Sequence, residues 1–206
     1  NMHNVETTQA LVLAAEEAKA LVFLQVGRAV VPHMGLRKAY EMTRRVAEES
    51  GADVVIHLDH GPEDEVLEAI KLGFGSVMYD GAHLPFEENI DLTASAVRLA
   101  AERGFAVEGE LGVMTGNENG DPSQGVAERS LFTDPRAAGE FVARSGVSAL
   151  AASFGSVHGV YRQQPRIDFD LIEELAAASG VPLVMHGGSG LSPEVYRRSV
   201  AAGVRK

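Results

Sequence analysis

Cysteine and tryptophan are both absent from the 206 residues. Without thiols the chain cannot form a disulfide or offer a thiolate to a metal, so any transition metal must be bound by histidine, aspartate or glutamate. Runs of more than two consecutive lysines or arginines are also absent, and the formal net charge is −11. Affinity for a phosphate backbone needs a clustered basic face. We therefore expect no nucleic-acid partner.

Long hydrophobic runs are missing as well. A membrane-spanning helix needs roughly 20 predominantly apolar residues, and every apolar run here is far shorter. No basic segment followed by an apolar one opens the chain, so we expect no membrane partner and a cytoplasmic location. Hydrophobic residues make up 45% of the chain, enough for one buried core, and the length favours a single domain over residues 1–206.

Short apolar, β-branched runs alternate along the chain with longer segments of helical periodicity. The predicted strands are 22–26, 54–58, 76–80, 106–111, 148–154 and 182–186. Several helical segments end in the glycine expected just past a helix C-terminus. This alternation is typical of a parallel sheet, either a (β/α)8 barrel or a doubly wound sheet.

Nearly every predicted strand ends in a polar or glycine-rich tip. A closed barrel brings all such tips around one mouth, whereas an open sheet brings together only those at its switch point. We therefore predict an α/β protein with the (β/α)8 TIM-barrel fold. Six strands are two short of eight, so we expect a barrel incomplete at both termini, with the eighth strand missing.

Three histidines, each followed by glycine, stand at the tips of three different strands: His60, His158 and His186. A lone histidine at such a place is more often a satisfied core residue. Three imidazoles that converge from separate strands make a zinc site with an open fourth position, which is the catalytic arrangement. The pattern therefore predicts a catalytic metal centre.

The first of these tips raises a problem of direction. In a straight strand Asp59 and His60 point to opposite faces. Gly61 and Pro62 follow, and because proline cannot continue a central strand, we predict a turn that lets both side chains face the mouth. His57 shares the face of Asp59 one layer lower, where we interpret it as a buried hydrogen-bonding support.

Carboxylates accompany the histidines. Asp59 is a candidate general acid/base, and Asp80 and Glu110 are placed to orient the histidines or bind metal. The alternative for Asp80 is an ordinary turn acid. Glu118 lies in the aperiodic segment 112–131, which we interpret as an active-site lid or, alternatively, as a surface excursion.

The segment 186–190, HGGSG, follows the last predicted strand and precedes a helix with Ser192 as N-cap and Pro193 as first residue. Exposed backbone N–H groups beside a helix start form an anion site, and barrels commonly bind phosphate after their late strands. A glycine-rich turn alone is a weak signal. Its position directly after a predicted zinc ligand strengthens it.

The motifs HLDHG, SVMYDGAHLPFEEN, VEGELG, TDP, SFGSVHGVY and PLVMHGGSG occur in this order across essentially the whole chain. In order and spacing this set resembles the class II, zinc-dependent ketose-bisphosphate aldolases. The resemblance implies a (β/α)8 barrel and a lyase that reversibly cleaves fructose or tagatose 1,6-bisphosphate. The products would be dihydroxyacetone phosphate and glyceraldehyde 3-phosphate, formed through a zinc-stabilised enediolate.

The resemblance also implies roles for single residues. The histidines His60, His158 and His186 would bind the catalytic Zn²⁺. Asp59 would exchange the proton on the aldehyde oxygen, and Glu118 would take the proton from dihydroxyacetone phosphate.

Other implied roles concern a further metal and the substrate phosphate. Glu110 and Asp80 match acids that hold a displaced or second metal, and a monovalent cation is a further candidate cofactor. Gly159, Gly187 and Ser189 match residues that cradle the phosphate, and Asn1 matches an asparagine at the end of the first strand. A small-molecule sugar phosphate is the expected partner, and a homodimer or homotetramer the expected assembly.

The chain departs from the family pattern in three places. The loop after the strand 22–26 reads Gly27-Arg28 where the family usually has a serine and small residues, the lid keeps Glu118 but not the acid after it, and the eighth strand is missing. Alternatives therefore stay open: an aldolase for another ketose phosphate, such as that of inositol breakdown, a non-catalytic barrel subunit that partners an aldolase, or a metal-dependent hydrolase.

A class I aldolase, which uses a lysine Schiff base, is disfavoured by the placement of the lysines. Lys19, Lys38 and Lys71 lie in predicted helices, and Lys206 is the final residue. With no lysine recognised at a strand tip, the metal route is favoured.

Overall fold

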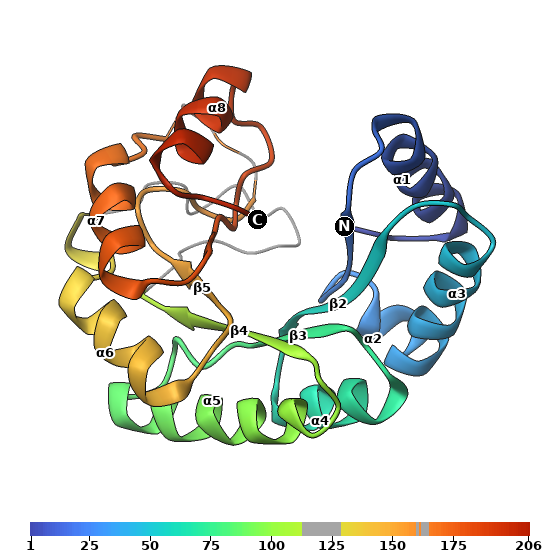
Figure 1. Cartoon of the computed structure of the whole chain (residues 1–206), viewed down its shortest axis with the longest axis horizontal. Coiled ribbons are helices and arrows are strands. Elements are labelled where there is room, and N and C mark those ends of the chain that lie inside the picture. The colour runs from blue at the N-terminus through green and yellow to red at the C-terminus, as the bar shows by residue number, and fades with distance from the viewer. Residues whose placement is uncertain (113–128, 160, 162–164) are drawn as a thin grey trace. The chain divides into compact units, whose positions relative to one another are not determined.

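The computed structural model describes residues 1–112, 129–159, 161 and 165–206 (Figure 1). Within them parallel strands alternate with α-helices, which confirms the predicted α/β class. The chain divides into two compact units, Asn1–Asp80 with Arg98–Val107 and Gly81–Val97 with Glu108–Lys206. The single domain over 1–206 stays a prediction. Among the described helices none has the length and apolar character needed to cross a membrane.

The first unit contains three strands and four helices, together with the end of α5 (Phe86–Ala101) and the start of β4 (Ala106–Leu111). Its elements in chain order are α1 (Val5–Ala18), β1 (Val22–Val26), α2 (Val31–Met34), α3 (Leu36–Glu48), β2 (Val54–Gly61), α4 (Glu63–Leu72) and β3 (Ser76–Tyr79). β2 pairs in parallel with β1, Val54 opposite Val22, and with β3, His57 opposite Ser76. Met2 N donates to Gln25 O at 3.1 Å, so the segment with Asn1 runs beside the tip of β1.

Local signals explain where these helices begin and end. Asn4 caps α1 in a capping box, in which its side chain accepts from Thr7 N and the Thr7 hydroxyl oxygen accepts from Asn4 N. Helix α4 begins directly after Pro62, with three acids in its first turn, where the helix dipole favours negative charge. It ends at Gly73, whose φ of 101° is open to glycine without the penalty that a side chain carries.

The predicted end of the second strand at residue 58 is wrong. β2 continues to Gly61, but its pairing with β3 changes register between Leu58 and Gly61. Within this irregular stretch His60 adopts a left-handed backbone with a φ of 51°. The change of direction therefore falls at His60, one residue before the predicted turn at Gly61 and Pro62.

The second unit contains most of β4 and the later elements. These are α5 (Phe86–Ala101) and β4 (Ala106–Leu111), both divided between the units, and then η1 (Arg129–Leu131), α6 (Pro135–Ser145), β5 (Ala149–Ala152), α7 (Phe169–Ser179), β6 (Leu183–Val184) and α8 (Pro193–Ala202). β5 pairs in parallel with β4 and β6, and Val204 forms a parallel bridge to Leu183. Helices α6 and α7 run side by side along this sheet (Figure 1).

β5 and β6 are shorter than predicted, whereas β4 has the predicted bounds. β5 ends at Ala152 rather than at 154, and β6 ends at Val184 rather than at 186. Beyond both ends the chain leaves the sheet, and Phe154 O accepts instead from Asp168 N at 2.9 Å. The core of the unit nevertheless contains fully buried apolar side chains, among them Phe141, Leu150 and Leu175, which are all 0% exposed.

Candidate metal centre and active site

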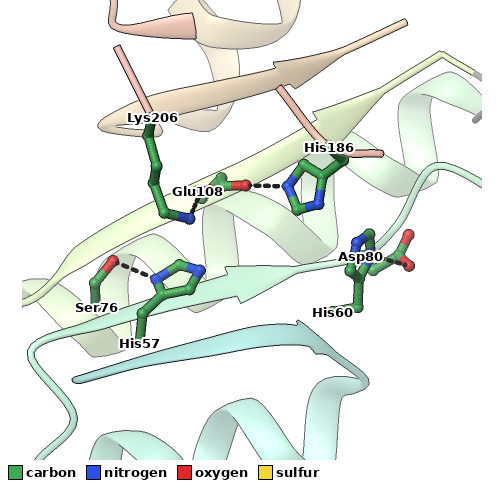
Figure 2. A network of polar contacts seen from close by, with 7 residues as sticks. All are labelled: His57, His60, Ser76, Asp80, Glu108, His186 and Lys206. Carbon is green, nitrogen blue, oxygen red and sulfur yellow. Dashed lines mark hydrogen bonds and ion pairs between the residues drawn. The ribbon is translucent and has the colours of Figure 1, made fainter. Parts of the chain in front are cut away.

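The strand ends of the first unit bring a histidine and two acids to neighbouring positions. Asp59 and His60 lie at the end of β2, with 5% and 9% of their surfaces exposed, and Asp80 directly follows β3. His60 Nδ1 lies 3.0 Å from Asp80 Oδ2 (Figure 2). Asp80 therefore orients a histidine, which is one of the two uses predicted for it.

The backbone of His60 is strained. Residues other than glycine avoid a φ near +50°, at a cost of about 1–2 kcal/mol. Such a conformation persists where the surrounding structure holds it in place. Here the register shift beside it and the contact of its ring with Asp80 both fix the residue. The strained backbone conformation is thus found at His60, a candidate metal ligand.

His57 has the structural role predicted for it. Its side chain is fully buried, and Nδ1 lies 2.9 Å from the Ser76 hydroxyl of the paired strand (Figure 2). The Phe23 ring packs edge-on against it, with the ring centroids 6.3 Å apart. The ring is thus held inside the sheet, one layer below Asp59.

The loop after β1, where the sequence departs from the family pattern, lies against Asp59. A Cβ atom placed on Gly27 would be 3.3 Å from Asp59 Oδ2, so glycine permits the close approach. Arg28 reaches Glu65 in α4, with Nη1 and Oε2 3.7 Å apart. Burial raises the pKa of Glu65 above its ordinary value, against the lowering effect of the Arg28 charge.

In the second unit His158 and His186 lie together. Their ring centroids are 5.6 Å apart, and the rings are tilted by 58°. His186 Nε2 is 2.7 Å from Glu108 Oε1, and Glu108 Oε2 is 2.7 Å from Lys206 Nζ (Figure 2). Glu108 is only 2% exposed and has lost its hydration, and the charge of Lys206 balances that of its carboxylate inside the protein.

A tyrosine joins the two loops that carry these histidines. The Tyr161 hydroxyl accepts from Val157 N at 3.0 Å and donates to Gly187 O at 2.6 Å. Burial raises the pKa of this hydroxyl, so it stays a neutral donor. Gly187 has a φ of 67°, and a Cβ atom there would lie 2.3 Å from Val157 O. Only glycine therefore lets the two loops approach so closely.

The other predicted site residues occupy different surroundings. Glu110 is 4% exposed, and its backbone carbonyl accepts from Asn89 Nδ2 at 2.9 Å. Gly159 is half-buried, while Ser189 and Asn1 are exposed. Glu118 and the rest of segment 113–128 lie outside the described residues.

Three residues with polar contacts at this site were missed by the sequence analysis: Glu108, Tyr161 and Lys206. A signal existed for Glu108, because it stands two positions before Glu110 and so shares its face of the strand. Lys206 was discounted as the final residue, yet its amine reaches the interior. Nothing in the local sequence marked Tyr161 as a link between two loops.

Parallel strands that end in histidines paired with carboxylates define an α/β enzyme with the donor set of a metal centre. Residues 1–206 match the family model described as fructose-bisphosphate aldolase class-II. The fructose-bisphosphate aldolases of Geobacillus stearothermophilus and Staphylococcus epidermidis are 40% and 38% identical to the chain, covering all of it and 72% of their own lengths. A crystal structure of the YdjI aldolase from Escherichia coli K12 superposes with a TM-score of 0.86 at 33% identity, with the same coverage.

The chain belongs to the class-II fructose-bisphosphate aldolase family. It is therefore a lyase that makes and breaks carbon–carbon bonds, from a family that depends on a metal and acts on sugar phosphates.

Proposed function

We propose that the chain reversibly cleaves a ketose 1,6-bisphosphate, fructose or tagatose, into dihydroxyacetone phosphate and glyceraldehyde 3-phosphate with the help of a bound Zn²⁺. The observation that carries this proposal is that His158 and His186 lie together after two strands, with His186 held by Glu108, in a chain that matches the family throughout. The architecture that we propose with this activity is the (β/α)8 barrel, in which such strand ends form the active site.

We propose that His60, His158 and His186 bind the metal. Neutral imidazoles suit zinc, and a histidine that ligates a metal usually gives its other ring nitrogen to a carboxylate. Asp80 engages Nδ1 of His60 and Glu108 engages Nε2 of His186, as this rule requires. His60 would therefore bind through Nε2 and His186 through Nδ1.

Glu110 and Asp80 are proposed to hold a displaced or second cation. Both have carboxylate oxygens, the donors that hard cations prefer. Asp80 is suited to this because its side chain is 34% exposed and can leave His60 at small cost. A monovalent cation is an alternative occupant.

Zn²⁺ bound at this site would act as a Lewis acid that stabilises the negative charge left on the dihydroxyacetone phosphate half when the C3–C4 bond breaks. Asp59 takes the proton of the C4 hydroxyl during cleavage and returns it to the aldehyde oxygen during condensation. Its burial keeps bulk water from exchanging that proton. Glu118 is proposed to move the proton at C3 of dihydroxyacetone phosphate.

The substrate phosphate is proposed to bind near the start of α8. Gly159, Gly187 and Ser189 offer backbone N–H groups and a hydroxyl, and Asn1 adds an amide. The tight approach of Gly187 to Val157 supports this assignment, since it fixes the backbone that would receive the phosphate. A homodimer or homotetramer in the cytoplasm is proposed on the resemblance to the family alone.

The test is release of dihydroxyacetone phosphate from fructose and tagatose 1,6-bisphosphates. We expect release that chelation abolishes and added zinc restores, with the ratio between the sugars naming the substrate. Asp59→Asn is the matched control, because it should bind zinc normally and yet release no product. A wild-type protein that binds zinc and cleaves neither sugar would contradict the proposal.

An aldolase for another ketose phosphate is the second candidate. Gly27 borders Asp59, and Arg28 is tied to Glu65, so the loop that departs from the family lies beside the proposed acid. A panel of ketose monophosphates, assayed beside the bisphosphates, separates the two candidates. The same panel identifies a non-catalytic subunit, which would bind zinc and cleave none of them.

Schiff-base chemistry at Lys206 is a poor alternative. Its amine lies 2.7 Å from the buried carboxylate of Glu108, a contact that would have to break before the nitrogen could attack a carbonyl. Borohydride treatment in the presence of dihydroxyacetone phosphate should therefore leave no covalent adduct, as judged by the intact mass of the protein.

A further inference from the structure

We propose that Glu108 and Lys206 are positioning residues for His186: Lys206 fixes the Glu108 carboxylate, and Glu108 fixes the imidazole so that Nδ1 is presented to the metal. This inference rests on the proposed function, since it assumes that His186 is a metal ligand. Neither residue is proposed to touch the substrate. Their effect is on the affinity and geometry of the metal site.

The contacts form a chain of three side chains from three segments of the second unit. His186 follows β6, Glu108 lies in β4, and Lys206 lies two residues beyond the bridge between Val204 and Leu183. The two links are 2.7 Å each, the length of charge-assisted hydrogen bonds. Figure 2 shows Glu108 between the other two, and its Oε1 contacts His186 while its Oε2 contacts Lys206.

Burial makes the lysine necessary. The side chain of Glu108 is 2% exposed, that of His186 5% and that of Lys206 13%. A buried carboxylate that loses its cation is strongly destabilised, because its charge is left without hydration or partner. Lys206 therefore determines whether Glu108 can remain a charged acceptor at this place.

The backbone holds the lysine beside the histidine. Met185 N donates to Lys206 O at 2.9 Å, and Arg205 N donates to Leu183 O at 2.9 Å. The residue directly before His186 is thus hydrogen-bonded to Lys206 itself. Two adjacent parallel segments carry the histidine and the cation, and neither can shift along the other without breaking these bonds.

The consequence is control of the imidazole tautomer. A charged carboxylate can only accept, so the hydrogen of the neutral ring is placed on Nε2 and the lone pair on Nδ1. A metal binds the lone pair. Without Glu108 the His186 ring can rotate or change tautomer. Part of the free energy of metal binding is then spent on restoring the tautomer and orientation that present the Nδ1 lone pair.

Two substitutions test the pair. Glu108→Gln keeps the size of the side chain but removes the charge, and Lys206→Met keeps the aliphatic stem but removes the amine. We expect Glu108→Gln to weaken zinc binding about 10–100-fold, the usual effect of losing such a partner. Lys206→Met should weaken it about tenfold or less, and Lys206→Arg should restore part of the loss because it keeps a cation.

The experiment measures zinc affinity of the full chain by competition with a chromophoric chelator, and follows Co²⁺ binding by visible absorption as a report on ligand geometry. Ser145→Ala is the matched control. Its hydroxyl is buried in the same unit and donates to Phe141 O at 2.6 Å within α6, away from His186. This variant should lose stability to denaturant and keep both the zinc affinity and the Co²⁺ spectrum.

The double variant Glu108→Gln with Lys206→Met gives the decisive comparison. If the lysine acts through Glu108, removing it in the Glu108→Gln background should cost no further zinc affinity. If the double variant loses zinc affinity by the product of the two single losses, the residues act independently and the inference is overturned. It is also overturned if the single variants bind zinc as tightly as the wild type. A wild-type chain that binds no zinc would instead overturn the proposed metal centre, so the two failures are distinct.

Discussion

His60 in the first unit and His186 in the second are both held by a carboxylate, but in opposite ways. Asp80 engages Nδ1 of His60 and has a side chain 34% exposed, whereas Glu108 engages Nε2 of His186 and is 2% exposed. A partly exposed acid keeps part of its hydration and can change partners. A buried acid depends on its lysine and is fixed. The same kind of contact thus gives one adjustable histidine and one rigid histidine.

The two histidines also differ in how the backbone directs them. His60 stands in a strained left-handed conformation beside a register shift. His186 precedes a glycine that takes the left-handed conformation in its place, with a φ of 67° at Gly187. In the first unit the left-handed backbone falls on His60 itself, which is strained. In the second unit it falls on Gly187, which adopts it without strain because it has no side chain.

The largest effect is expected from removing either histidine. His60→Ala and His186→Ala should each lower kcat/KM by at least about 10³-fold, because two protein ligands do not retain a catalytic zinc. The measurement is steady-state cleavage with saturating zinc, together with metal content after dialysis. His83→Ala is the control, since no role at the metal site is proposed for that histidine. Full zinc occupancy in either ligand variant would remove that histidine from the centre.

The comparison between the two carboxylates gives a smaller effect. Asp80→Asn should weaken zinc binding by less than about tenfold, and less than Glu108→Gln does, because water can partly replace a hydrogen bond that is only part-buried. Competition with a chelator measures both variants under the same conditions. Equal losses would show that burial of the acid does not decide its importance.

Tyr161→Phe should cost about 1–3 kcal/mol of unfolding free energy, because it leaves a backbone donor at Val157 and an acceptor at Gly187 without their shared partner. It should also weaken zinc binding, since the two loops carry His158 and His186. Urea unfolding and chelator competition measure the two effects. Ser76→Ala is the matched control in the first unit, with a similar loss of stability and unchanged zinc affinity.

The smallest effect concerns Glu65 and depends on pH. Its pKa is raised by burial, so the folded chain binds its proton more tightly than the unfolded chain. The stability contributed by this group therefore falls as pH rises from the ordinary value of 4.5 to the raised pKa. Glu65→Gln should stabilise the protein by about 0.5 kcal/mol or less at pH 7. A gain that persists below pH 4.5 would contradict this origin.

Local features of the fold were predictable, because they depend on neighbouring residues. The αL glycines Gly73, Gly146 and Gly180 end helices at the predicted kind of position. The apolar runs located every strand of the described residues, with the ends of 22–26 and 106–111 as predicted and the other ends differing by up to three residues. His57 was predicted as a buried support because its face and layer follow from the strand alone.

The network around His186 was not predictable, because its members are distant along the chain. Glu108 is 78 residues from His186 and 98 from Lys206. No local pattern reports which acid meets which base across such separations. The left-handed backbone of His60 was also missed, because sequence rules assign that conformation to the following glycine. Both failures concern residues whose geometry depends on tertiary contacts.

The strained backbone at His60 has a consequence for directed evolution. Glycine at this position would relieve about 1 kcal/mol of strain, yet it would delete a proposed metal ligand. A library randomised at this codon and screened for heat resistance without metal should therefore enrich glycine, while a screen for activity should return histidine. Stability and function conflict here at a single residue, and the enrichment ratio between the two screens would report how strongly each is selected.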